Sequence, residues 1–171
     1  MQTLTTQCCI AGGGPAGIML GYLLARQGVD VIVLEKHADF FRDFRGDTVH
    51  PSTLQAFSEL GLLDSLLQRL FEKTETIGVL IEGELFPVAD FRSLKVAAPF
   101  VAMMPQWDFL DHVADEGRTL PHFRLMMSAK ATRYTEEGGR VTGLVAETPD
   151  GPVTIRATLT VGADGRSSDL R

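Results

Sequence analysis

The stretch CCIAGGGPAGIML, residues 8–20, decides the fold of this chain. Residues 6–12 (TQCCIAG) form an apolar run that predicts a buried strand, and residues 15–28 have the apolar spacing of a helix that ends at Gly28. Residues 29–36 (VDVIVLEK) are rich in β-branched side chains and predict a second strand. The sequence therefore predicts a β-α-β unit whose first loop is cleared of side chains, so that another group can approach its backbone closely.

The glycines of this loop follow the spacing of a dinucleotide site. Gly12, Gly14 and Gly17 form G-x-G-x-x-G between strand and helix, and Glu35 ends the second strand, roughly 20 residues further on, as that motif requires. Gly12 permits the tight turn, Gly14 lets a pyrophosphate approach the helix N-terminus, and Gly17 permits close helix packing. We predict that the adenosine half of a dinucleotide binds here.

Glu35 also bears on which dinucleotide fits. Its carboxylate can accept hydrogen bonds from ribose hydroxyls, and it disfavours a 2′-phosphate because two negative groups would meet. We include the flanking residues Pro15, Ala16 and Lys36 in the predicted cofactor site.

Length and composition limit the other possibilities. The chain has 171 residues, 44% of them hydrophobic, which is enough for one domain with a proper core. Its formal net charge is −6 and its basic residues are scattered, so nucleic acid is not an expected partner. No signal sequence or membrane-spanning run is visible, which predicts a soluble, cytoplasmic protein.

The rest of the chain continues the alternation of helix and strand. Residues 50–70 predict a helix broken near Gly61, and residues 76–91 predict strand, turn and strand. Residues 100–106 lead into a helix over residues 107–117. From Phe123 onward the pattern indicates short strands, with turns at residues 137–140 and 149–151, ending in an apolar strand over residues 157–165.

The last residues add a second motif. In LTVGADGRSSDLR, residues 159–171, Asp164, Gly165, Ser168 and Arg171 form D-G-x-x-S-x-x-R after an apolar strand. With the first glycine motif, this resembles the single-component, class A FAD-dependent aromatic hydroxylases of the para-hydroxybenzoate hydroxylase type. The resemblance implies that Asp164, Gly165 and Arg171 lie near the FAD pyrophosphate and take part in NADH or NADPH use.

Two further segments are similar to that family. Residues 41–62 resemble the segment in which an arginine reaches FAD, best matched by Arg45, with Arg42 as the alternative. Residues 103–113 resemble the family's helix start, which implies that Gln106 contacts the ribityl and phosphate region. The implied fold is α/β: a Rossmann-like, glutathione-reductase-type FAD-binding domain with a parallel sheet and a small inserted β-sheet region, whose start we place at about residues 74–104.

The sequence assigns no chemical role to several other residues. Cys8 and Cys9 are neighbours on a strand and point to opposite faces, so we interpret both as packing residues. The four histidines lack ligand spacing, and no metal site is predicted. Asp47 and His50 fit a solvated turn and a helix start, and a second set is interpreted as packing: Met103, Met104 and Trp107.

The resemblance also implies what these 171 residues do not contain. Family members continue to a third, Gly-Asp motif that holds the flavin, and to the elements that enclose the substrate. We therefore expect an FAD-binding, N-terminal portion, truncated relative to the family, that does not hydroxylate by itself. The sheet surface that faces the remainder should be uncovered and could drive self-association.

For the whole enzyme the resemblance implies reduction of FAD by NADH or NADPH and transfer of oxygen from O₂ to a small aromatic substrate. Two other functions stay open at this stage. The first glycine motif also occurs in NAD-linked dehydrogenases and other two-dinucleotide oxidoreductases, and a truncated module could bind FAD without catalysing any reaction. Catalytic residues are not identified.

Overall fold

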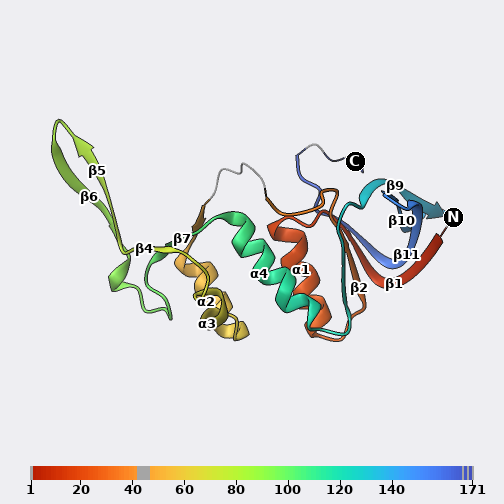
Figure 1. Ribbon diagram of the computed structural model, residues 1–171, viewed down its shortest axis with the longest axis horizontal. Helices are drawn as coiled ribbons and strands as arrows, with labels where there is room; N and C mark the ends of the chain where they lie inside the picture. Colours follow the sequence, from red (N-terminus) through yellow and green to blue (C-terminus); the bar gives the residue numbers. More distant parts are fainter. Residues whose placement is uncertain (1, 42–46, 167, 169, 171) are drawn as a thin grey trace. The chain divides into compact units, whose positions relative to one another are not determined.

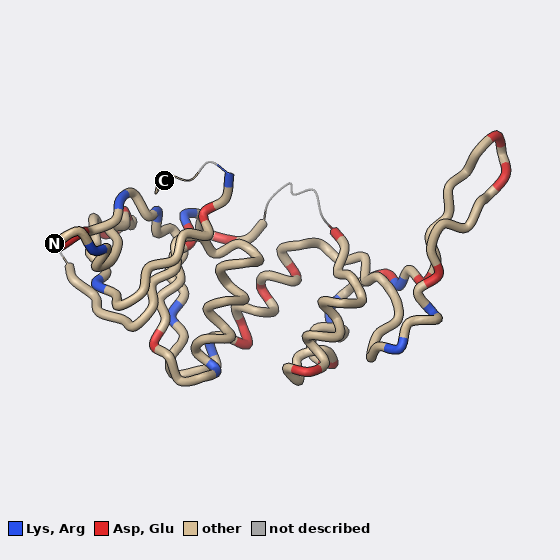
Figure 2. The backbone as a smooth tube through the Cα atoms, turned by 180° about the vertical axis from the view of Figure 1, so that it is seen from behind, with Lys and Arg blue, Asp and Glu red and all other residues tan. Residues whose placement is uncertain are grey.

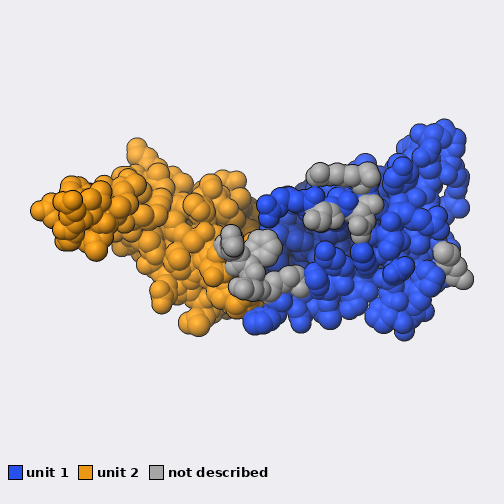
Figure 3. Space-filling view, turned by 90° about the horizontal axis from the view of Figure 1, so that it is seen from above, with its two compact units in different colours: residues 1–41, 110–171 blue, residues 42–109 orange. Residues whose placement is uncertain are grey.

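The structure is a computed structural model that describes residues 2–41, 47–166, 168 and 170. It contains two compact units, formed by residues 1–41 together with 110–171 and by residues 42–109 (Figure 3). The first unit carries the glycine loop at one end of its sequence and the terminal motif at the other.

A six-stranded sheet forms the first unit (Figure 1). Its strand order is β8-β2-β1-β11-β10-β9; β8, β2, β1 and β11 run parallel to one another, and β10 is antiparallel to both β11 and β9. The strands are β1 (Gln2–Ala11), β2 (Val31–Leu34), β8 (Phe123–Met126), β9 (Lys130–Glu137), β10 (Arg140–Thr148) and β11 (Gly151–Gly162). A mixed α/β fold with a largely parallel sheet is thereby confirmed.

Helices cover one face of the parallel strands. In α1 (Pro15–Arg26), Gly21 lies against Val33 and Phe123, and in α4 (Gln106–Arg118), Gly117 lies against the same phenylalanine ring. Because side chains alternate along a strand, the residues next to those that meet α1 face the other way. On that opposite face a buried cluster joins the parallel strands to β10: Cys9, Ala11, Ile32, Leu34, Ala129, Leu144, Ala146, Val153 and Ile155.

The β-α-β unit agrees closely with the sequence pattern. Helix α1 begins with Pro15 at its first position and ends at Arg26, two residues before the predicted end at Gly28, which takes a positive φ of 80°. Cys8 and Cys9 are buried and form no disulfide, as expected for packing residues. Burial raises the pKa of the Cys9 thiol to about 12, and the adjacent Cys8 adds to this shift.

The last strand differs from the prediction of short strands. Residues 151–162 form one strand that pairs with β1 along nearly its whole length and with β10 over its first half. This strand brings residues near the C-terminus beside the residues that lead into the glycine loop.

The second unit contains two short helices, a small sheet and a hairpin. Helix α2 (Pro51–Leu60) ends at Gly61, which takes a left-handed φ of 76°, and α3 (Leu63–Leu66) follows, as the predicted break requires. The three-stranded sheet has the order β3-β7-β4, and β5 and β6 form a separate hairpin. The elements are β3 (Thr48–Val49), β4 (Glu72–Thr74), β5 (Thr76–Ile81), β6 (Glu84–Asp90), the 3₁₀ helix η1 (Phe91–Ser93) and β7 (Val101–Met103).

Two pairs of aromatic rings contribute to packing inside the second unit. The rings of Phe57 and Phe109 lie 5.2 Å apart between centroids, and Phe71 stacks on Phe100 at 6.0 Å. Met104 is buried, as predicted for a packing residue, whereas Met103 is 38% exposed.

One glycine in the first unit allows a direct test of this sheet. Gly143 sits at an irregularity in β10 with φ 152°, and a Cβ there would collide with the carbonyl oxygen of Ile155. We expect Gly143→Ala to lower the free energy of unfolding by about 3 kcal/mol or more in a urea titration. Gly139→Ala is the control, because it has φ 78° but open space around its Cβ, and should cost only about 1–2 kcal/mol. Equal losses in the two variants would contradict the steric explanation.

Candidate functional site

The glycine loop joins the end of β1 to the start of α1. Gly12 takes φ 105°, and a Cβ on it would overlap the carbonyl oxygen of Ala163. A Cβ on Gly17 would overlap the carbonyl oxygen of Gly12. Gly12 and Gly17 are therefore required by the fold of the loop itself, since a side chain at either position would displace backbone.

The fold of the loop does not require a glycine at position 14. It is the N-cap of α1, with an ordinary φ of −67°, and a Cβ built on it would meet nothing within 4 Å. The first turn of α1 contains no acidic residue, and glycine cannot cap it with a side chain. A helix start of this kind presents backbone N–H groups and a partial positive charge to the space beside Gly14.

Glu35 is held at the end of β2, facing the glycine loop. Its side chain is 7% exposed, and Oε2 accepts a hydrogen bond from the Gly13 amide at 3.1 Å while Oε1 accepts one from the His37 amide at 3.0 Å. A Cβ on Gly13 would lie 2.8 Å from the Cβ of Glu35. The carboxylate thus fixes the loop to the end of β2.

The terminal motif lies beside this loop. The amide of Ala163 donates a hydrogen bond to the carbonyl of Ala11 at 2.7 Å, which continues the pairing of β11 with β1 up to the motif. Asp164 is half-buried and Gly165 is exposed with φ 87°, while Ser168 Oγ accepts a hydrogen bond from the Leu170 amide at 3.1 Å. Two motifs about 150 residues apart in sequence therefore meet at the C-terminal ends of neighbouring parallel strands, where ligands of open α/β sheets bind.

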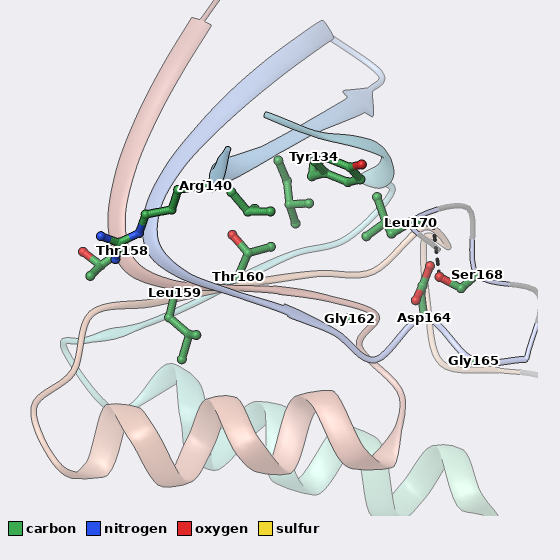
Figure 4. A pocket seen from close by; sticks show the side chains of 12 residues that line it. Tyr134, Arg140, Thr158, Leu159, Thr160, Gly162, Asp164, Gly165, Ser168 and Leu170 are labelled. Atoms are coloured by element: carbon green, nitrogen blue, oxygen red, sulfur yellow. Dashed lines mark hydrogen bonds between the residues drawn. The ribbon is translucent and has the colours of Figure 1, made fainter. Parts of the chain in front are cut away.

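A hollow of about 580 Å³ adjoins the terminal motif. Asp164 and Gly165 line it together with residues of β9, β10 and β11, among them Tyr134, Arg140 and Thr160. Figure 4 shows Tyr134, Thr160 and Leu170 on one side of β11, whereas Leu159 points toward the helices. Thr160 Oγ1 is buried without a hydrogen-bond partner among the described residues.

The remaining predicted residues fall into three groups. Lys36, Pro15 and Ala16 belong to the first unit and are exposed beside the residues above. Gln106 is the first residue of α4 and is half-buried in the second unit. The last group lies outside the described residues: Arg42, Arg45 and Arg171.

His50 starts a helix as the sequence suggested, whereas Asp47 lies next to a strand pair and not in a turn. The Asp47 carbonyl accepts a hydrogen bond from the Met104 amide at 3.0 Å, and His50 is the N-cap of α2 without a side-chain capping bond. In the part of the chain that the structure describes, no group of three or more His, Cys, Asp or Glu could hold a metal ion, and no helix is long and apolar enough to cross a membrane.

Sequence reasoning missed Gly13 and Ala163. Gly13 is the variable position of the motif, yet it donates to Glu35 and has no room for a side chain. The three consecutive glycines, one more than the motif needs at that point, were the available signal. Ala163 immediately precedes the terminal motif, and only the strand pairing reveals its contact with Gly12.

The fold and the loop define an α/β dinucleotide-binding protein, and comparison with known families narrows this class. Residues 5–171 match the family described as FAD binding domain. The chain belongs to this family, the FAD-binding domain of class A FAD-dependent aromatic monooxygenases.

Individual relatives agree with this assignment. The chain is 30% identical over 166 residues to 6-methylpretetramide 4-monooxygenase of Streptomyces rimosus, covering 97% of this chain and 40% of the relative. It is 29% identical over 175 residues to a 3-(3-hydroxy-phenyl)propionate/3-hydroxycinnamic acid hydroxylase of Paraburkholderia xenovorans, covering 99% of this chain and 27% of the relative. A 32% identical relative, dialkyldecalin synthase of Streptomyces rugosporus, is named for another reaction; the match covers 95% of this chain and 33% of that protein.

A solved structure shares the fold. The p-nitrophenol 4-monooxygenase of Pseudomonas putida aligns with a TM-score of 0.85 at 24% identity, over 98% of this chain and 42% of that chain. The 171 residues thus span less than half the length of each of these proteins.

Proposed function

We propose that the first unit binds the adenosine and pyrophosphate part of FAD, and that the protein acts as an NADH- or NADPH-dependent monooxygenase that hydroxylates an aromatic substrate with O₂. Gly14 carries the proposal, because it is the one glycine of the G-x-G-x-x-G motif that neither φ nor a neighbouring atom of the chain requires. An empty position at a helix start, facing no part of its own chain, is what a closely bound phosphate needs.

The roles of the residues follow from their positions. The backbone of Gly14, Ala16 and Gly17 at the start of α1 offers amides to the pyrophosphate, and Pro15 sets the first turn without needing a partner for an N–H group. Glu35 accepts hydrogen bonds from the ribose hydroxyls with the same carboxylate that accepts the amides of Gly13 and His37. Asp164 and Gly165 border the pyrophosphate from β11, beside Gly12.

The remaining predicted residues would contact other parts of the cofactor. By family resemblance, Arg45 and Arg171 supply positive charge to the phosphates and Gln106 contacts the ribityl and phosphate region. Lys36 is included because it follows Glu35 directly. FAD, when bound, supplies the redox chemistry that takes electrons from the nicotinamide and activates oxygen. The residues named here bind and orient the cofactor; no group of this chain is assigned a role at the reacting atoms.

Ligand competition tests the proposal. We expect the purified chain to quench FAD fluorescence on titration and ADP to compete, because both carry the adenosine and pyrophosphate that the loop recognises. FMN is the control: it has the flavin but no adenosine, and should bind at least tenfold more weakly. Equal affinity for FAD and FMN, or binding of NAD⁺ in preference to FAD, would contradict the proposed site and favour a different cofactor assignment.

Turnover of the whole protein is a separate test. Oxidation of NADH or NADPH that a phenolic compound stimulates, with hydroxylated product found by mass spectrometry, is the expected result for the monooxygenase. If FAD binds but product never forms with any aromatic compound tried, the reaction is of another kind, as the name of the dialkyldecalin synthase relative illustrates.

A further inference from the structure

Gly13 occupies the variable position of the glycine motif, between the start of α1 and Glu35. It is buried, and its amide donates a hydrogen bond to Glu35 Oε2 at 3.1 Å. Its φ lies outside the left-handed region, so its backbone conformation does not require glycine. A Cβ at this position would lie 2.8 Å from Glu35 Cβ and 3.2 Å from Glu35 Oε2. Contact with the Glu35 side chain is therefore what excludes a larger residue.

Residues 126–129 fix the backbone of Glu35 from the side of β8. The Glu35 amide donates a hydrogen bond to the Met126 carbonyl at 2.8 Å, and the Glu35 carbonyl accepts one from the Ala129 amide at 2.8 Å. The direction of a Cβ atom is set by the backbone and does not change when the side chain rotates. Glu35 can therefore turn its carboxylate, but it cannot withdraw its Cβ from position 13.

The residue before Gly13 is fixed as well. The Gly12 amide donates a hydrogen bond to the Leu34 carbonyl at 2.8 Å, and a Cβ on Gly12 would overlap the carbonyl oxygen of Ala163. A methyl group at position 13 can therefore be accommodated in two ways: the Glu35 carboxylate turns away, or the start of α1 shifts away from the end of β2. Each change alters the spacing between the helix N-terminus and the carboxylate.

This spacing is important because the two ends of the site bind by different means. Helix α1 carries no charged side chain before Arg26 at its far end (Figure 2). Its start therefore offers a phosphate backbone amides, whose directions the loop determines. On the side of β2, the Glu35 carboxylate is the acceptor proposed for the ribose hydroxyls. A binding site has to hold such groups within about 0.5 Å of the productive geometry.

We propose that Gly13 is a positioning residue that sets the spacing between the phosphate-binding start of α1 and the ribose acceptor Glu35, so that one ligand reaches both. This inference rests on the proposed FAD site, and it assigns the specificity for an intact ribose to the pair Gly13 and Glu35. With a larger residue at position 13, the phosphates still reach the helix N-terminus, but the ribose hydroxyls no longer meet the carboxylate in full. Binding remains and the preference for the ribose hydroxyls is lost.

Two ligands that differ only in the ribose test the proposal. ADP carries both ribose hydroxyls, and 2′,3′-dideoxyadenosine 5′-diphosphate carries neither but keeps the adenine and both phosphates. Isothermal titration calorimetry on the purified 171-residue chain gives two dissociation constants, and their ratio measures the ribose contact. We expect the unsubstituted chain to prefer ADP by about tenfold or more, which corresponds to one charge-assisted hydrogen bond, and Gly13→Ala to reduce this preference by about threefold or more.

Gly28→Ala is the matched control. Gly28 follows the other end of α1 and has φ 80° with open space around its Cβ, so alanine strains the backbone there without meeting a neighbour. It should lower the melting temperature and leave the preference for ADP unchanged, because a general loss of stability affects both ligands equally. Circular dichroism establishes that both variants fold.

A second measurement needs no substitution. If Gly13 positions Glu35 for the ribose, then by linkage a ribose bound to Glu35 stabilises the hydrogen bond between these two residues. Amide hydrogen exchange followed by NMR at saturating ligand should show slower exchange of the Gly13 amide with ADP than with the dideoxy compound. The Gly21 amide, inside α1, should exchange at the same rate with both.

The outcomes separate this inference from the FAD site on which it rests. A Gly13→Ala variant that folds and keeps the full preference for ADP overturns the positioning role and leaves the FAD site in place, as does equal exchange of the Gly13 amide with both ligands. Equal affinity of the unsubstituted chain for both ligands also overturns it, because Glu35 then makes no ribose contact. If the unsubstituted chain binds neither ligand, the proposed FAD site itself is wrong, and the inference with it.

Discussion

Gly14→Val is expected to abolish FAD binding, with at least a hundredfold loss of affinity, while the protein without FAD stays folded. The added side chain enters space that no atom of the chain occupies within 4 Å, and φ −67° is accessible to valine. The folded state should lose only the roughly 1 kcal/mol that a β-branched residue costs at an N-cap relative to glycine. A pyrophosphate bound at the α1 N-terminus could not tolerate the added side chain, because it must contact the backbone at this position.

Gly17→Ala is the matched control for this experiment. Its Cβ collides with the carbonyl oxygen of Gly12, so it should lower the melting temperature strongly and lose FAD binding only as a result. Differential scanning fluorimetry without FAD, followed by fluorescence titration with FAD, measures both properties. If Gly14→Val destabilises the protein without FAD as much as Gly17→Ala does, Gly14 belongs to a purely structural turn and the proposed phosphate contact is wrong.

The local pattern of the sequence was sufficient for much of the fold. The first strand, α1 and β2 follow from apolar spacing and from glycine and proline placed at the helix ends, and Gly61 terminates α2 as its position in the pattern indicates. These features depend on residues within one element or one turn. Propensity and periodicity describe interactions over that range.

Local sequence patterns could not predict which distant strands pair with each other. Residues 151–162 form one strand beside β1 through hydrogen bonds between segments about 150 residues apart. The alternation of apolar and polar side chains within a segment does not determine which strand it pairs with. The hydrogen bond from Gly13 to Glu35 likewise arises only after the β-α-β unit has folded. The spacing of the glycines predicted a nucleotide site, but it did not distinguish the glycines that the loop needs from the one it leaves open.

Glu35 is the second position where a large effect is expected, and the structure changes how it should be tested. From sequence, Glu35→Arg should weaken FAD binding by about 1–3 kcal/mol because a ribose acceptor is lost. The structure adds a second consequence: the carboxylate accepts the amides of Gly13 and His37 at 7% exposure, so arginine would also leave these donors unpaired. Arginine therefore cannot separate binding from folding.

Glu35→Gln separates the two effects. Glutamine keeps the shape and one acceptor oxygen, so it can still accept the Gly13 amide, but its NH₂ group cannot accept a second hydrogen bond and its negative charge is gone. We expect FAD affinity to fall about tenfold or more, since a charge-assisted hydrogen bond is worth about 1.5–3 kcal/mol. The free energy of unfolding without FAD should fall by about 1.5–3 kcal/mol, because the His37 amide loses its charge-assisted bond to the carboxylate while the Gly13 amide keeps an acceptor.

The losses in FAD affinity and in the free energy of unfolding distinguish the two proposed roles of Glu35, which are to contact the ribose and to fix the glycine loop. Urea denaturation without FAD and fluorescence titration with FAD should be run on Glu35→Gln and on Glu35→Ala, with Glu136→Gln, an exposed carboxylate on β9, as the control. Both variants should lose FAD binding, whereas alanine, which removes both acceptors, should lose more stability than glutamine, which keeps one. A glutamine variant that binds FAD with unchanged affinity would show that Glu35 only fixes the glycine loop, and the ribose contact would then have to be assigned to another residue.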